Sequence, residues 1–324
     1  MTIMKTKLFI AFIAGAFFML STVSCDKVEN PFPPTFNSEL DTTYYSGNWS
    51  DYLANEWPDF TTLPNDDPNR NALIEDFTGH NCSNCPAAAT VAHNLHEGNP
   101  SRVYVASMHS SPAGMSGFQQ VNESQGYTVD FTNPNGLELG TFFGDLSGSG
   151  FFGNPAGTVN RALEGTEYFY ASGFWSTKVN QILSSALKVN IKAKVNFYDA
   201  NKGGYLHTEV EVIDPALTNE LGQVVYLIED SLVGPQNVSS TYTPDYVHRD
   251  IFRKTLSGQS FGRTLSATYL TNGKYYLDYS FSIPNQLAPI NQTGTYNAEN
   301  MHLLIYVYDK VTLEIYQVIK KKLI

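Results

Sequence analysis

The spacing of apolar and polar residues along the chain changes character once, near residue 187. Between residues 72 and 187, short apolar runs alternate with segments whose apolar residues recur every three to four positions, a pattern typical of strands separated by helices. From residue 188 onward, apolar and polar positions alternate in runs rich in β-branched and aromatic residues. We therefore expect an α/β domain followed by an all-β domain.

The α/β part has a clear succession of predicted elements. Pro86 lies near the first turn of one helix, where proline is tolerated. Gly153 and Pro155 interrupt the chain just before a further short strand. Strands are predicted at residues 72–78 and 102–108, and helices at about 82–97, 137–145 and 174–187.

Seven strand-like runs follow between residues 188 and 324, and turn residues separate them. This number and spacing predict an antiparallel β-sandwich. Asn272-Gly273 is the strongest hairpin signal, because Asn-Gly accepts the positive φ angles of a type I′ turn.

The first 24 residues are predicted to be an export signal. Lys5 and Lys7 precede an apolar stretch at residues 8–20 that is too short to span a bilayer comfortably. The following segment, Thr22-Val23-Ser24-Cys25, resembles the lipobox of bacterial lipoproteins, which implies that Cys25 becomes an acylated amino terminus and a membrane anchor. The alternative is an ordinary secretory signal that contains a cysteine.

Residues 25–70 are rich in Pro, Asn, Asp and Thr without sustained periodicity, and we interpret them as a tether. The predicted organisation is therefore a signal peptide (1–24), a tether (25–70), an α/β domain (71–187) and a β-sandwich domain (188–324).

Composition agrees with a folded protein and excludes one class of partner. With 42% hydrophobic and 16% charged residues, the chain can bury a sizeable core. A formal net charge of −11 argues against a nucleic-acid partner, because phosphate contacts need clustered Lys and Arg.

Cys82 and Cys85 are the thiols that remain if Cys25 is lipidated, and they lie in a compartment where thiols tend to be oxidised. A disulfide that closes about four residues stabilises a protein by only about 2 kcal/mol, so stability alone explains this spacing badly. A helix amino terminus favours the thiolate of the first cysteine. Cys82 is therefore the candidate attacking thiol and Cys85 the resolving thiol, with a structural clasp as the alternative.

The α/β part resembles a thioredoxin fold. The resemblance rests on Asp76 six residues before Cys82, the Cys-x-x-Cys at a helix start, and a Gly-x-Pro before a later strand. It implies that the bond before Pro155 is cis and faces the dithiol, that Pro155 shapes access to it, and that Asp76 is a buried acid that assists proton transfer. An exposed carboxylate at a strand end is the alternative for Asp76.

Three separated motifs are more specific. Together, EDFTGHNCSNCP (75–86), FFGNPAGTVNR (151–161) and DYVHRDIFRKTL (245–256) resemble the outer membrane protein twenty-eight-related (Omp28-like) lipoprotein family of Bacteroidota. The resemblance implies an outer-membrane or cell-surface lipoprotein with a thioredoxin-like domain and a carboxy-terminal β domain. Asn81 stands where thioredoxins carry Trp, so we expect the disulfide to be open to solvent, with Cys82 the more exposed.

Metal binding is a third interpretation of the cysteine pair. The histidines that accompany the pair match no standard ligand spacing, so we expect neither a metal nor a cofactor. They are His80, His93, His96 and His109. The third motif shows no spacing of nucleophile and base, and we expect its polar residues to be structural, at a sheet corner or domain interface. They are His248, Arg249, Asp250 and Arg253.

The sequence therefore supports two functional hypotheses. The first is a lipid-anchored surface protein whose Cys82–Cys85 disulfide exchanges with a protein thiol or disulfide. The second is a noncatalytic adhesion or receptor-type lipoprotein that binds a host or surface ligand and has an inert disulfide.

Overall fold

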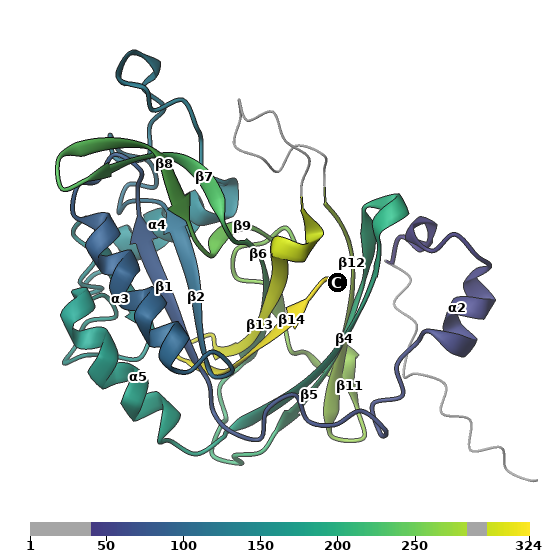
Figure 1. Cartoon of the computed structure of the whole chain (residues 1–324). Helices are drawn as coiled ribbons and strands as arrows, with labels where there is room; N and C mark the ends of the chain where they lie inside the picture. Colours follow the sequence, from purple (N-terminus) through teal and green to yellow (C-terminus); the bar gives the residue numbers. More distant parts are fainter. Residues whose placement is uncertain (1–39, 284–296) are drawn as a thin grey trace, which may run out of the picture. The chain divides into compact units, whose positions relative to one another are not determined.

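The computed structural model describes residues 40–283 and 297–324 (Figure 1). The predicted signal peptide, Cys25 and the first part of the predicted tether lie outside the described residues. Within the described residues, no helix is both long enough and apolar enough to cross a membrane.

The central element is an eight-stranded mixed sheet with the order β14-β13-β6-β9-β2-β1-β3, in which β10 also pairs with β6. β1 and β2 pair in parallel, and a parallel bridge between Ser107 and Ile251 joins β2 to β9. The sheet therefore combines strands from both sides of residue 187. The strands are β1 (Ala72–Thr78), β2 (Val103–His109), β3 (Ala156–Val159), β6 (Leu221–Glu229), β9 (Ile251–Thr255), β10 (Arg263–Thr264), β13 (Met301–Asp309) and β14 (Ile315–Lys322).

A second, four-stranded sheet has the order β11-β12-β5-β4. One hydrophobic cluster joins it to β6, β13 and β14, with Leu206 and Leu277 from one sheet and Val225 and Ile305 from the other. The strands of both sheets bury one face in this cluster, and β6 and β13 are buried on the opposite face as well, where Tyr226 and Tyr306 belong to a second cluster. The strands are β4 (Val189–Tyr198), β5 (Gly203–Val212), β11 (Leu270–Thr271) and β12 (Lys274–Ser282).

The predicted Asn-Gly hairpin is confirmed. Thr271 pairs with Lys274, and Asn272 and Gly273 between them have φ angles of 51° and 80°. Both residues thus adopt the positive φ angles that this turn requires.

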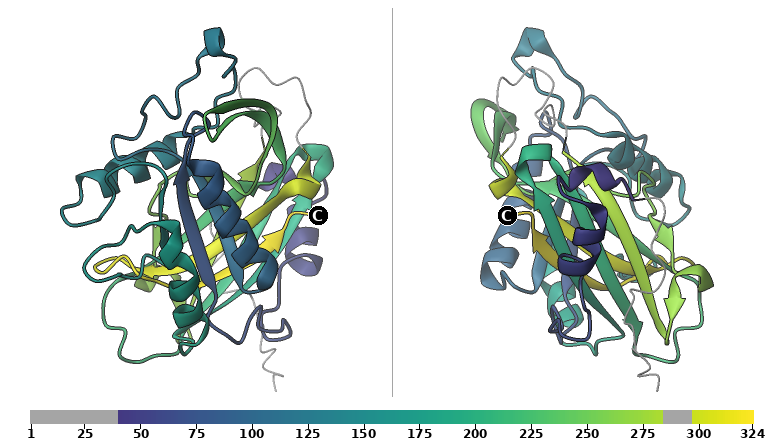
Figure 2. Two further views of the ribbon diagram at one scale, coloured as in Figure 1. Left: turned by 60° about the vertical axis from the view of Figure 1, so that its left-hand side comes forward. Right: turned by 90° about the vertical axis from the view of Figure 1, so that its right-hand side faces the viewer.

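Helices cover both faces of the sheet around β1 and β2. The helices α3 (Cys85–Gly98) and α5 (Trp175–Leu183) lie on one side of β1 and β2 (Figures 1 and 2). Ala88 and Val179 from these helices belong to one cluster with Val105. On the opposite face, Phe143 of α4 (Pro134–Asp145) packs in a cluster with Phe77. All residues of β1 and β2 are consequently buried, which accounts for their continuous apolar runs. The expectation of an α/β and β-rich fold is confirmed.

The described part of the predicted tether, residues 40–70, packs on the four-stranded sheet. Tyr52 of α2 (Trp49–Asn55) is fully buried, and its hydroxyl lies 2.6 Å from His207 Nε2. Lys192 Nζ donates to the carbonyl of Phe60 at 2.8 Å. The sequence did not reveal this contact because irregular backbone and single aromatic side chains attach the segment, and neither produces a periodic pattern.

A buried polar network crosses the central sheet. Arg161 Nε and Nη2 donate to the two carboxylate oxygens of Glu75 at 2.8 and 2.7 Å, and both side chains are fully buried. Tyr226 donates from its hydroxyl to the same carboxylate at 2.9 Å. The network joins β1 to β6, which belongs to the second half of the chain.

Candidate functional site

Cys82 and Cys85 form a disulfide with Cα atoms 5.4 Å apart. Cys82 lies in the loop that follows β1, and Cys85 is the first residue of α3, with Pro86 next to it. The predicted disulfide at a helix start is confirmed.

The expectation that the disulfide is open to solvent is wrong. Cys82 is only 2% exposed and Cys85 only 1%. Because both cysteines are buried to nearly the same extent, exposure does not single out Cys82 as the attacked sulfur.

A hairpin from the second half of the chain covers the cysteine loop. It consists of β7 (Leu232–Val238) and β8 (Thr241–His248), which form a two-stranded sheet of their own among the described residues, and we call it the cover hairpin (residues 232–248). Asn237 N donates to the carbonyl of His80 at 2.7 Å, and Ser239 N to that of Ser83 at 3.0 Å. The side chain of Gln236 also contacts this loop, because its Nε2 donates to the carbonyl of Cys82 at 3.2 Å.

The polar insertion after β2 closes another side of the loop. Asn81 N donates to the carbonyl of Phe118 at 3.0 Å. Gln119 Nε2 donates to the carbonyl of Thr78, the last residue of β1, at 2.7 Å. Backbone and side-chain contacts thus cover the cysteine loop, which we expected to be open with Asn81 in place of Trp.

The Asn154–Pro155 peptide bond is cis, as the thioredoxin resemblance implies. Asn154 accepts hydrogen bonds from Ser111 Oγ at 2.5 Å and from Gln119 Nε2 at 3.3 Å. This side-chain network connects the loop before β3 to the insertion that covers the disulfide. The role of Pro155 toward a substrate stays a prediction.

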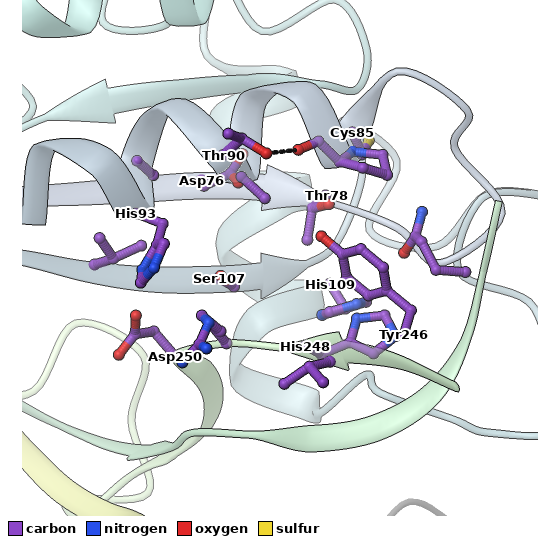
Figure 3. Close-up of a pocket in the computed structure, with 17 residues that line it drawn as sticks. Asp76, Thr78, Cys85, Thr90, His93, Ser107, His109, Tyr246, His248 and Asp250 are labelled. Carbon is purple, nitrogen blue, oxygen red and sulfur yellow. Dashed lines mark hydrogen bonds between the residues drawn. The ribbon is translucent and has the colours of Figure 1, made fainter. Parts of the chain in front are cut away.

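A cavity of about 260 Å³ lies between α3, the strands β1 and β2, and the cover hairpin (Figure 3). Cys85 lies toward one end of it, and His93 and Asp250 lie toward the other. Cys82 does not line it. Its polar lining residues are Asp76, Thr78, Thr90, His93, Ser107, His109, Gln236, Tyr246, His248, Arg249 and Asp250.

Asp76 is the most deeply buried carboxyl group of this cavity, with an exposed fraction of 1%. Within the described residues, neither of its oxygens has a hydrogen-bond partner. Burial raises its pKa from 3.8 to about 7. The exposed alternative for Asp76 is therefore wrong, and the group can both take up and release a proton near neutral pH.

Two histidines face the same cavity as neutral side chains. Burial lowers the pKa of His248 to about 4 and that of His109 well below its ordinary value. Their ring centroids are 5.6 Å apart. Both ring nitrogens of His109 and Nε2 of His248 lack a hydrogen-bond partner in the part of the chain that the structure describes.

The polar residues of the third motif were only partly understood from the sequence. We expected them at a sheet corner or domain interface, yet His248, Arg249 and Asp250 line the cavity together with Cys85. The register explains this, because Ser107 N donates to the carbonyl of Asp250 at 2.8 Å and so aligns the motif with β2. The sequence gave one indication that these residues lie near the cysteines, because their motif and the cysteine motif both belong to the family resemblance.

The histidines singled out beside the cysteine pair do not assemble into a ligand set. His80 Nε2 lies 3.1 Å from the carbonyl of Gln120, and His96 Nδ1 lies 2.6 Å from that of Val103. No group of three or more His, Cys, Asp or Glu residues is placed to hold a metal ion in residues 40–283 and 297–324.

Comparisons with known proteins give a family and solved structures of similar proteins. The family model described as outer membrane protein Omp28 matches residues 148–324. The structure of HBP35 of Porphyromonas gingivalis is similar in fold, with a TM-score of 0.58 and 16% identity over 79% of this chain and 76% of that one.

A crystallised domain of the outer membrane lipoprotein Omp28 from Porphyromonas gingivalis is 20% identical. The match covers 43% of this chain and 89% of that domain, with a TM-score of 0.29. No curated protein matches.

Proposed function

The chain belongs to the Omp28 family of outer membrane proteins, and on that premise we propose that it is a lipoprotein that carries out thiol–disulfide exchange at Cys82–Cys85. Its location is the outer membrane, as the sequence predicts. Acylation of Cys25 as the membrane anchor is part of the proposal, and it rests on the lipobox resemblance.

The arrangement of β1, α3 and β2 supports a thioredoxin-like domain at residues 71–187. The strands β1 and β2 precede and follow α3 along the chain and pair with each other in parallel. The disulfide lies where α3 begins, and a cis proline precedes β3, which pairs antiparallel with β1. Strands β9, β6, β13 and β14 extend this sheet beyond the proposed domain.

The observation that carries the proposal is that Asp76 and Cys85 line the same cavity. A carboxyl group with a pKa of about 7 is a proton acceptor and donor at neutral pH, which is the property that exchange at a buried sulfur requires. A purely structural clasp has no need of an unpartnered buried carboxyl group beside it, since such a group costs folding free energy.

The proposed reaction moves two electrons into the disulfide. An external thiol loses its proton to the Asp76 carboxylate, and the resulting thiolate attacks one sulfur to form a mixed disulfide. The other sulfur leaves as a thiolate and takes up a proton. A second external thiol then releases the first one as an oxidised disulfide and leaves Cys82 and Cys85 reduced.

The test is reduction of the folded, mature protein under native conditions, followed by alkylation and mass measurement. We expect both thiols to become alkylated while circular dichroism shows that the fold is retained. A disulfide that resists reduction until the protein unfolds, with a potential below about −300 mV, would contradict the proposal.

A noncatalytic surface protein with an inert disulfide is the second candidate. The burial of both cysteines beneath the cover hairpin favours it, because exchange requires access to a sulfur. The same reduction experiment separates the two candidates.

A further inference from the structure

The cover hairpin depends on its docking contacts for its position. It forms a two-stranded sheet of its own among the described residues, and a two-stranded hairpin by itself is at best marginally stable in water. The insertion after β2 provides one set of contacts, in which the Tyr242 hydroxyl donates to the carbonyl of Gly126 at 3.1 Å. Leu232 packs against Val129 and Phe131 of the same insertion. The cysteine loop provides a second set.

The second set of contacts includes the ring of residues that the disulfide closes. Gln236 Nε2 donates to the carbonyl of Cys82, and Ser239 N donates to the carbonyl of Ser83. Both acceptors belong to the ring of residues 82–85. Because a carbonyl group lies in its peptide plane, the direction in which each acceptor points depends on the backbone angles of this ring. The hairpin therefore binds to atoms whose arrangement the disulfide restricts.

Reduction removes this restriction, and little else in the loop replaces it. A crosslink between residues three apart excludes most of the conformations that the open loop can adopt. Asn84 precedes α3 without a side-chain cap, and the hydrogen bond from Cys85 N to the carbonyl of Cys82 is 3.3 Å long. In the reduced loop, docking of the hairpin must first fix the peptide planes again. The hairpin consequently binds the oxidised loop more tightly than the reduced loop.

We infer that the Cys82–Cys85 disulfide and the cover hairpin form a redox-sensitive switch, in which reduction of the disulfide releases the hairpin from the cysteine loop. This goes beyond the proposed exchange function, because the coupling depends only on whether the crosslink is present. In the step itself, a dithiol supplies two electrons and two protons and becomes a cyclic disulfide. The Sγ–Sγ bond breaks, and two thiols remain on the protein.

The switch changes the surface around the cysteines. With the hairpin docked, Cys82 is 2% exposed and Gln236 is 3% exposed. Release of the hairpin exposes both residues, together with the loop carbonyls that the hairpin occupies. A partner protein can therefore distinguish the reduced form from the oxidised form, and the hairpin in turn stabilises the oxidised form, because the coupling is reciprocal.

The first experiment measures amide hydrogen exchange by NMR in the mature protein, before and after reduction with dithiothreitol. The reporters are the amides of Asn237 and Ser239, which donate to the cysteine loop. Ser107 N, which donates to the carbonyl of Asp250 in the central sheet, is the reference for a general loss of stability. Relative to this reference, we expect both reporters to exchange about tenfold faster after reduction, within the limit of about 20-fold that the entropy of a four-residue ring allows.

The double variant Cys82→Ser/Cys85→Ser removes the crosslink without a reductant. Its two reporter amides should exchange as they do in the reduced wild type. Equal exchange in the oxidised wild type and the double variant, relative to Ser107, would overturn the inference and leave the exchange function intact. A disulfide that cannot be reduced in the folded protein, together with a released hairpin in the double variant, would overturn the exchange function and leave the coupling.

The second experiment measures the reciprocal effect on the reduction potential. Gln236→Ala removes a bond that the oxidised loop favours, so docking to the oxidised form should weaken about fivefold while docking to the reduced form changes little. The potential should then rise by about 20 mV, which is the equivalent of this factor for a two-electron couple. Thr241→Ala, on the exposed start of β8, should leave the potential unchanged. Equal potentials in the wild type and Gln236→Ala would overturn the inference.

Discussion

Glu75 and Arg161 form a bidentate ion pair inside the central sheet, with oxygen–nitrogen distances of 2.7 and 2.8 Å and no exposed side-chain surface. The two residues come from the first and second of the motifs that carry the family resemblance. Breaking a buried pair by removing one partner leaves an uncompensated charge in the interior. The pair therefore makes these two motifs depend on each other for stability.

Arg161→Met should lower the free energy of unfolding by about 3 to 5 kcal/mol, because the Glu75 carboxylate loses its cation. Denaturant titration measures the loss. The double variant Glu75→Gln/Arg161→Met should be less destabilised than Arg161→Met alone. A double variant that is less stable than either single variant would contradict this account of the pair.

Asp76→Asn should stabilise the protein, and the gain should depend on pH. The folded pKa of about 7 lies above the ordinary 3.8, so the native state binds more protons than the unfolded state between these values. The stability of the wild type therefore falls as pH rises from about 4 to about 7, by on the order of 3 to 4 kcal/mol.

The variant should unfold like the wild type near pH 4 and be more stable at pH 8 in thermal melts. The exposed Asp51→Asn serves as its control. Despite this gain, Asp76→Asn should slow disulfide exchange at pH 7 by about 10²-fold, because the proton acceptor is lost. A variant that exchanged as fast as the wild type would leave Asp76 without a part in the reaction.

Gln236→Ala should loosen the cover hairpin over Cys82. The substitution removes the side chain that bonds the Cys82 carbonyl, at a cost of about 1 kcal/mol, so opening should become about fivefold more frequent. Reduction by a protein dithiol should accelerate by the same factor. Thr241→Ala at the exposed start of β8 is the matched control, and an equal acceleration in both variants would count against a specific role of Gln236.

Cys25→Ala should release the protein from membranes or leave it as an unprocessed precursor, because the cysteine thioether would carry the lipid. Membrane fractionation and mass spectrometry of the amino terminus check this. An unmodified amino terminus at another residue would show that the lipobox resemblance is misleading.

Local patterns predicted the elements that local forces determine. The strand at residues 72–78, the Asn272-Gly273 turn and the disulfide at the start of α3 all follow from periodicity, turn chemistry and cysteine spacing. Each of them depends on residues close together in the sequence.

The surroundings of the disulfide depend on contacts distant in sequence, and these were missed. Asn237 bonds to His80, and the bridge between Ser107 and Ile251 brings His248 to the cavity. The hydrophobic periodicity around one residue gives no information about a contact partner far away in the sequence. The sequence could therefore not show that the disulfide is covered. The packing of Tyr52 against His207 was missed for the same reason.

The sharing of one sheet by both halves of the chain has a consequence for assembly during export. A chain that crosses a membrane from its amino terminus delivers Cys82 and Cys85 about 150 residues before the cover hairpin. Until the hairpin docks, the two thiols are accessible to oxidising enzymes, and they become enclosed only afterwards. Timing, rather than surface exposure in the finished fold, can therefore determine when the bridge is made.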